Sequence, residues 1–140
     1  MDKNLRRELI LDNFNNPMNK HTGDESYLMI NTNNESCIDN LDIYYKIDSG
    51  KIIDICFDGE ACAISTSATS VMIKTLIGKT LDEAREILTN YENMINEKDY
   101  DVDLLGELNI YDEIYLQPNR KTCALLPFNS LKKALHKCGE

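Results

Sequence analysis

A β-hairpin pattern in the first half of the chain limits the folds that are open to it. Residues 41–47 and 52–57 alternate apolar and polar side chains, and residues 48–51 (Asp-Ser-Gly-Lys) between them form a turn signal. Alternation with a period of two predicts two half-buried antiparallel strands. Residues 27–30 are a candidate third strand, and the polar residues 31–36 that follow are typical of a loop.

Helical patterns lie on both sides of this hairpin. Residues 2–14 carry an apolar stripe, which predicts a helix that packs inward through Leu5, Leu9, Ile10 and Phe14. Residues 63–77 have helical spacing and end at Gly78, a typical C-terminal stop.

The second half of the chain contains one clear helix start. Thr80 and Glu83 have the spacing of a capping box, which predicts a helix that runs to about Ile95. Residues 96–121 fit no single pattern. A last helix is expected after Pro127, because proline suits a first helical position.

The order helix, sheet, helices predicts one α+β domain over residues 1–140, with a small antiparallel sheet of about three strands packed against several helices. No apolar run is long enough to span a membrane, and residues 1–8 lack the apolar segment of a secretory signal, so a cytoplasmic protein is expected. The formal net charge of −9 disfavours binding to phosphate backbones, so no nucleic-acid partner is expected.

Five cysteines are the main chemical signal, and their odd number in a reducing compartment argues against a disulfide framework. They are Cys37, Cys56, Cys62, Cys123 and Cys138. Cys56 lies within a predicted strand, which is typical of a buried structural thiol. Cys62 and Cys123 precede predicted helices, where a thiolate is stabilised.

Asp39 follows Cys37 by two residues, so both side chains point to one face of an extended segment. Together with Cys62 and Cys123, they would give three sulfur ligands and one oxygen ligand, a set suited to Zn²⁺. By spacing alone, buried cysteines and a solvated aspartate explain the pattern better than a metal site does.

The three cysteine neighbourhoods together resemble the SufU branch of the NifU/IscU-like iron–sulfur cluster assembly family. Residues 34–39, Asn-Glu-Ser-Cys-Ile-Asp, are similar to the family motif Asn-Pro-x-Cys-Gly-Asp. Residues 57–62, Phe-Asp-Gly-Glu-Ala-Cys, are similar to Phe-x-Gly-x-Gly-Cys, and a Ser/Ala-rich helix follows in both. Residues 120–126, Arg-Lys-Thr-Cys-Ala-Leu-Leu, match Arg-x-x-Cys-Ala-x-Leu. Thr122 stands where IscU-like members carry a histidine, and this points to SufU.

The resemblance implies a zinc site made by Cys37, Asp39, Cys62 and Cys123. It also implies a sulfurtransferase-like role, in which Cys37 accepts sulfur from a pyridoxal-phosphate cysteine desulfurase of the SufS type for downstream iron–sulfur assembly proteins. Arg120 belongs to the third motif and is expected to tune a ligand interaction near Cys123.

Two other functions remain open. The same four residues could hold a transient [2Fe–2S] cluster on an assembly scaffold, because thiolates bind such clusters readily. The chain could also be a structural domain whose cysteines are merely buried. Glu35, Ile38 and Ala61 depart from the proline and glycines of the family motifs, and Ile38 does not easily adopt a positive φ.

Overall fold

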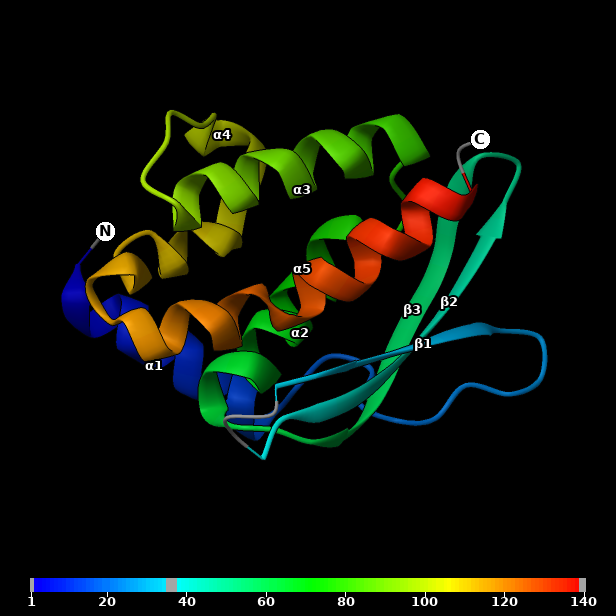
Figure 1. Ribbon diagram of the computed structural model, residues 1–140, viewed down its shortest axis with the longest axis horizontal. Coiled ribbons are helices and arrows are strands. Elements are labelled where there is room, and N and C mark those ends of the chain that lie inside the picture. The colour runs from blue at the N-terminus through cyan, green and yellow to red at the C-terminus, as the bar shows by residue number, and fades with distance from the viewer. Residues whose placement is uncertain (1, 35–37, 139–140) are drawn as a thin grey trace.

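The computed structural model describes residues 2–34 and 38–138 (Figure 1). Its elements follow the chain in the order α1 (Lys3–Asn15), β1 (Leu28–Asn33), β2 (Asn40–Asp48), β3 (Lys51–Glu60), α2 (Ala63–Leu76), α3 (Leu81–Ile95), α4 (Val102–Leu105), the 3₁₀ segments η1 (Gly106–Tyr111) and η2 (Ile114–Leu116), and α5 (Pro118–Cys138). The predicted α+β class and the small antiparallel sheet are confirmed. No helix in the described ranges is long and apolar enough to cross a membrane.

The sheet has the strand order β1-β2-β3, with both pairs antiparallel. The hairpin predicted over residues 41–57 forms, and Ile43 lies opposite Phe57 in it. The third strand is longer than predicted, because residues 31–33 belong to β1 rather than to a loop. Asn31 finds partners across the sheet, because its Nδ2 donates to the side chains of Asn40 and Asp42. Thr32 Oγ1 instead donates to the Leu126 carbonyl of α5.

Helix α2 runs through the centre of the molecule and is the element that all other layers cover. Its apolar face packs against the inner face of the sheet through residues such as Val71 and Met72, which are fully buried. Helices α1 and α5 flank it, and α3 packs on α5 (Figure 1). The serine- and threonine-rich first turns of α2 are also buried, so their hydroxyls must bond within the protein.

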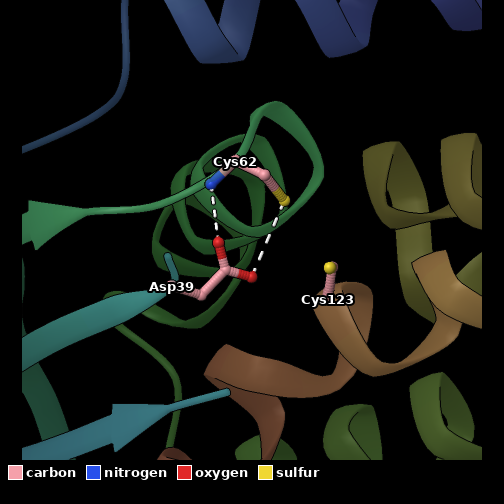
Figure 2. A group of neighbouring side chains, drawn as sticks. All are labelled: Asp39, Cys62 and Cys123. Atoms are coloured by element: carbon pink, nitrogen blue, oxygen red, sulfur yellow. Dashed lines mark hydrogen bonds between the residues drawn. The ribbon is translucent and has the colours of Figure 1, made fainter. Parts of the chain in front are cut away.

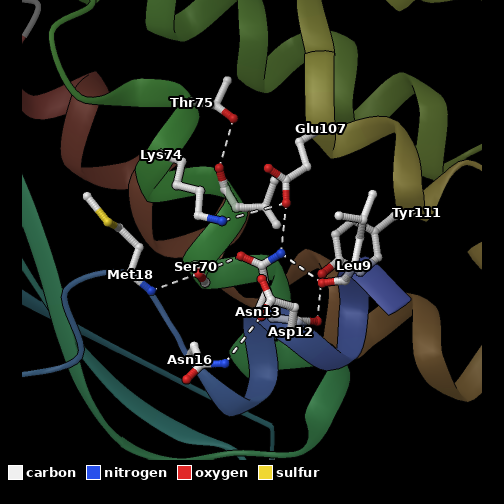
Figure 3. A network of polar contacts seen from close by, with 12 residues as sticks. Leu9, Asp12, Asn13, Asn16, Met18, Ser70, Lys74, Thr75, Glu107 and Tyr111 are labelled. Atoms are coloured by element: carbon white, nitrogen blue, oxygen red, sulfur yellow. Dashed lines mark hydrogen bonds and ion pairs between the residues drawn. The ribbon is translucent and has the colours of Figure 1, made fainter. Parts of the chain in front are cut away.

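Helix α1 forms as predicted, with Asp2 as its N-cap, but its buried face differs from the prediction. Leu5 is 46% exposed and Phe14 is 39% exposed, whereas Asn13 is buried. Asn13 bonds to Ser70 of α2 and to Glu107 of η1 (Figure 3). A polar contact therefore takes the place of part of the expected apolar stripe.

Helix α5 begins nine residues earlier than predicted, at Pro118, and Pro127 lies inside it. Proline has no N–H for the carbonyl four residues before it, which here belongs to Cys123. The structure supplies other donors at this point. Ser65 Oγ bonds to the Cys123 carbonyl, and Tyr91 bonds to the next carbonyl, that of Ala124. These tertiary contacts compensate for the interruption.

The predicted capping box at the start of α3 is confirmed, with Thr80 and Glu83 bonding to each other's backbone amides. The segment that fitted no pattern, residues 96–121, forms α4, η1, η2 and the start of α5. This segment carries the chain from the end of α3 to the first turn of α5, and so leads to Cys123.

Candidate metal centre

Asp39, Cys62 and Cys123 meet in one pocket (Figure 2). One ligand atom of each residue lies within 4.8 Å of the other two. Asp39 immediately precedes β2, Cys62 immediately precedes α2, and Cys123 lies in the second turn of α5. Three segments that are distant in the sequence thus bring two sulfur atoms and one carboxylate together.

Cys62 reaches the pocket because it is the N-cap of α2. Its backbone is extended, and its Sγ accepts a hydrogen bond from the Ser65 amide at 3.5 Å. The positive end of the helix dipole lies at this position. Cys62 therefore lies in the short link between β3 and α2, and its side chain points into the pocket.

The backbone of Asp39 is fixed by contacts with Asn34 and with the neighbouring strand β3. Its carbonyl accepts from the Asn34 amide at 3.0 Å, which closes the loop between β1 and β2. On the opposing strand, Gly59 has a φ of +126°, and a Cβ there would lie 2.2 Å from the Asn40 carbonyl oxygen. Only glycine permits this close approach of β3 to the residue that follows Asp39.

The Asp39 carboxylate is buried, with 1% of the residue exposed. Oδ1 accepts from the Cys62 amide at 2.7 Å, and Oδ2 accepts from Ser65 Oγ at 2.6 Å. Burial raises the pKa of the Asp39 carboxyl, but the hydrogen bonds from Ser65 and Cys62 outweigh it and hold the net pKa below its ordinary value. The pocket therefore contains a carboxylate anion rather than a neutral acid.

Cys123 is 6% exposed. Burial, followed by the nearby Cys62 thiol and the Asp39 carboxylate, raises the pKa of the Cys123 thiol to about 12. Two thiolates and a carboxylate cannot share such a pocket without a compensating positive charge. In the metal-free protein Cys123 is therefore a neutral thiol, and a bound cation is what would allow both cysteines to act as thiolate ligands beside the carboxylate.

The donor spacing agrees with a zinc ion. Zn–S bonds of about 2.3 Å and Zn–O bonds of about 2.0 Å at tetrahedral angles put sulfur and oxygen ligands about 3.5 Å apart. Cys62 Sγ lies 3.7 Å from Asp39 Oδ2. The Cys62–Asp39 pair therefore has the spacing of two zinc ligands, and Cys123 Sγ lies within 4.8 Å of both.

The structure places the remaining predicted residues as follows. Cys37 lies outside the described residues, as does the side chain of Cys138. Arg120 is exposed and lines the mouth of a hollow of about 510 Å³ that Cys62 and Cys123 also line. Its backbone amide bonds to Gln117.

Cys56 lies outside the pocket, in the middle of β3. It is fully buried, and burial together with the charge of Asp54 raises the pKa of its thiol to about 11. This environment is that of the structural thiol predicted for this position.

Two departures from the family motifs cause no backbone strain. Neither Ile38 nor Ala61 is among the described non-glycine residues with a positive φ. Ile38 is instead a 68% exposed apolar side chain beside the pocket.

Sequence reasoning missed Ser65. Its hydroxyl contacts Asp39, Cys62 and the Cys123 carbonyl, and it is fully buried. The only sequence signal was its place three residues after an N-cap, where a backbone amide points back to the cap side chain.

The profile of the NifU-like N-terminal domain matches residues 5–137. The chain belongs to this family. This NifU-like domain is 31% identical over 134 residues to the zinc-dependent sulfurtransferase SufU of Bacillus subtilis. The alignment covers 95% of this chain and 90% of that protein. It is also 29% identical over 135 residues to the iron–sulfur cluster assembly scaffold protein IscU of Thermotoga maritima, covering 96% of this chain and 95% of that protein.

A solved structure agrees with this NifU-like fold. The crystal structure of an iron–sulfur cluster assembly scaffold protein for the SUF system from Fervidobacterium islandicum superposes with a TM-score of 0.82 at 36% identity, covering 91% of this chain and 94% of that one. The resemblance to SufU-type members is confirmed, and the chain is placed among iron–sulfur cluster assembly proteins.

Proposed function

We propose that this NifU-like domain is a zinc-binding sulfur relay of the SufU type. The carrying observation is the convergence of Asp39, Cys62 and Cys123 at a spacing that suits a tetrahedral ion. Cys37 is the proposed fourth ligand, because the resemblance assigns it and because Asn34, the residue just before the undescribed segment 35–37, lines the hollow of Cys62 and Cys123. Bound zinc supplies positive charge that keeps the cysteines as thiolates near neutral pH.

The proposed reaction moves one sulfur atom. The Cys37 thiolate attacks the outer sulfur of a persulfide on a cysteine desulfurase. The persulfide S–S bond breaks, and the desulfurase cysteine leaves as a thiolate. Cys37 then carries the persulfide, and no net oxidation or reduction occurs. Downstream iron–sulfur assembly proteins are the proposed recipients.

A scaffold that holds a [2Fe–2S] cluster is the second candidate. It is supported by the likeness to the IscU scaffold protein of Thermotoga maritima over nearly all of both chains. Thr122 precedes Cys123, so this position offers no imidazole for a cluster. The sulfur relay is therefore the preferred proposal.

Elemental analysis of the untagged protein as isolated tests the proposal. We expect about one zinc ion per chain in the wild type, and its loss in Cys62→Ala. Cys56→Ala is the control and should retain the zinc, because Cys56 is also a free cysteine but lies outside the pocket. Iron with sulfide in place of zinc would make the scaffold the function. Absence of any metal in the wild-type protein would overturn both.

Desulfurase turnover then tests the role of Cys37. A Cys37→Ala variant is expected to lose the stimulation of a SufS-type desulfurase that the wild-type protein provides. A variant that stimulates as well as the wild type would contradict the assignment of Cys37 as the sulfur acceptor.

A further inference from the structure

Ser65 touches every described residue of the proposed ligand set. Its Oγ lies 2.6 Å from Asp39 Oδ2, 3.1 Å from the Cys123 carbonyl oxygen and 3.6 Å from Cys62 Sγ. Its amide also donates to Cys62 Sγ. The residue is fully buried, so water does not compete for these bonds.

The Ser65 hydroxyl has a single hydrogen to donate. Both strong acceptors within reach, the Asp39 carboxylate and the Cys123 carbonyl, can only accept. The shorter, charge-assisted bond goes to Asp39 and is the stronger of the two. In the metal-free protein, the hydroxyl therefore holds the Asp39 carboxylate.

The Cys123 carbonyl is available because of Pro127. In an uninterrupted helix the amide of residue 127 would donate to this carbonyl, but proline has no N–H. Ser65 thus keeps a second acceptor nearby.

The same contacts fix how many oxygen atoms Asp39 offers to a metal. Oδ1 faces the Cys62 amide, which donates to it at 2.7 Å. Only Oδ2 lies toward the two sulfur atoms (Figure 2). Asp39 is therefore arranged as a one-oxygen ligand, which agrees with four-coordinate zinc rather than with larger ions that prefer more oxygen atoms.

We propose that Ser65 is the positioning residue of this site: its hydroxyl holds Asp39 Oδ2, the oxygen that the Cys62 amide leaves free, beside the two sulfur atoms and so controls how tightly the pocket retains its metal. The inference rests on the proposed zinc site but does not depend on sulfur transfer. Hydrogen bonds to metal ligands elsewhere typically change metal affinity by about 10–100-fold.

The test compares two serines of the same helix. Ser65→Ala removes the hydroxyl at the pocket. Ser67→Ala is the matched control, because Ser67 is equally buried on α2 but bonds to Ile64 and Tyr111 instead. Ser65→Thr keeps a hydroxyl and serves as the rescue variant. Zinc affinity is measured by competition with a chromophoric chelator, and cobalt absorption reports the ligand geometry.

We expect Ser65→Ala to bind zinc about 10–100-fold more weakly than the wild type and to show an altered cobalt spectrum. Ser67→Ala and Ser65→Thr should stay within about threefold of the wild type, since neither loses a ligand contact. An unchanged affinity in Ser65→Ala, or an equal loss in Ser67→Ala, would overturn the inference.

Failure of the proposed function is a separate outcome. A wild-type protein that binds no zinc would contradict the metal site itself. Equal zinc affinities in the wild type and in Ser65→Ala would support the metal site but contradict the role of Ser65. Unfolding of the metal-free variants, followed by circular dichroism, shows that each has folded before its affinity is compared.

Discussion

Asp39 is a buried group that contributes to the response of the metal-free protein to acid. Its carboxyl pKa lies below the ordinary value of 3.8, because hydrogen bonds to the charged form outweigh burial. A group whose pKa is lower in the folded state stabilises the fold above its unfolded pKa. This contribution is fully present above about pH 5 and is lost as the pH falls through 4 toward the lowered value.

Asp39→Asn should remove this contribution. We expect a loss of about 1–3 kcal/mol in the free energy of unfolding of the metal-free protein at pH 7, because one buried donor, Ser65 or the Cys62 amide, then faces an amide NH₂. Between pH 5 and pH 3 the difference from the wild type should shrink. Urea unfolding at several pH values measures it.

Asp82→Asn provides the control, because the Asp82 side chain is 98% exposed. It should follow the wild-type pH profile with a change of less than about 0.5 kcal/mol. An Asp39→Asn curve that runs parallel to the wild type at every pH would show that Asp39 remains equally charged in both states.

At this scale the sequence identifies the ligand types but not what holds them. Cys62 and Cys123 could be singled out because each lies near a predicted helix start, and Asp39 because of its spacing from Cys37. Ser65 could not, since its bonds to Asp39 and to the Cys123 carbonyl span 26 and 58 residues. Contacts of that range follow from packing rather than from local pattern.

Asn13 is the buried polar residue of helix α1 and bonds to neighbouring elements (Figure 3). Its Nδ2 donates to the Leu9 carbonyl and to Glu107, both at 2.8 Å, and its Oδ1 accepts from Ser70 at 2.8 Å. Ser70 in turn accepts from the Met18 amide, which fixes the chain that leaves α1. One buried amide therefore joins α1, α2 and η1.

Asn13→Ala should cost about 1–3 kcal/mol of unfolding free energy, because it leaves the buried Ser70 hydroxyl without its acceptor. The half-buried Glu107 loses one partner but keeps Lys74. Amide hydrogen exchange should accelerate in α1 more than in α3. The unfolding free energy comes from chemical denaturation.

Asn16→Ala is the control on the same segment, because Asn16 is exposed and its side chain bonds to Asp12, which is also exposed. It should change stability by less than about 0.5 kcal/mol. Equal losses in the two variants would show that the buried network adds nothing beyond helix propensity.

Elements whose signals are local could be predicted from the sequence. The hairpin turn and the Thr80 capping box depend on residues within a few positions of one another. The start of α5 could not be predicted, because Pro127 is tolerated inside it only with help from distant donors such as Tyr91. The prediction of which face of α1 is buried is also wrong, because Asn13 is buried against its partners in α2 and η1.

A metal ion in the pocket would connect three parts of the whole molecule: the β1–β2 connection, the start of α2 and α5. A ligand that binds only the folded state stabilises it by about 4 kcal/mol at a thousandfold excess over its Kd. For a chain of this size, we expect zinc at that excess to raise the Tm by about 10 °C. Thermal unfolding at increasing free zinc checks this.

Cys62→Ala should abolish the shift, because it removes the ligand at the start of α2. Cys56→Ala should keep it, whatever its own Tm. A zinc-dependent rise in Tm of equal size in Cys62→Ala would place the ion elsewhere on the molecule.

The bonds that hold Asp39 are made entirely between protein atoms, and this decides how such a protein can be supplied with its ion. Zinc fingers become ordered only when the ion arrives, so loading them is a folding reaction. Here Ser65 and the Cys62 amide already hold the carboxylate in position. Delivery and withdrawal of the ion then become exchanges of ligands in a protein that is already folded, and a donor molecule does not have to unfold its acceptor.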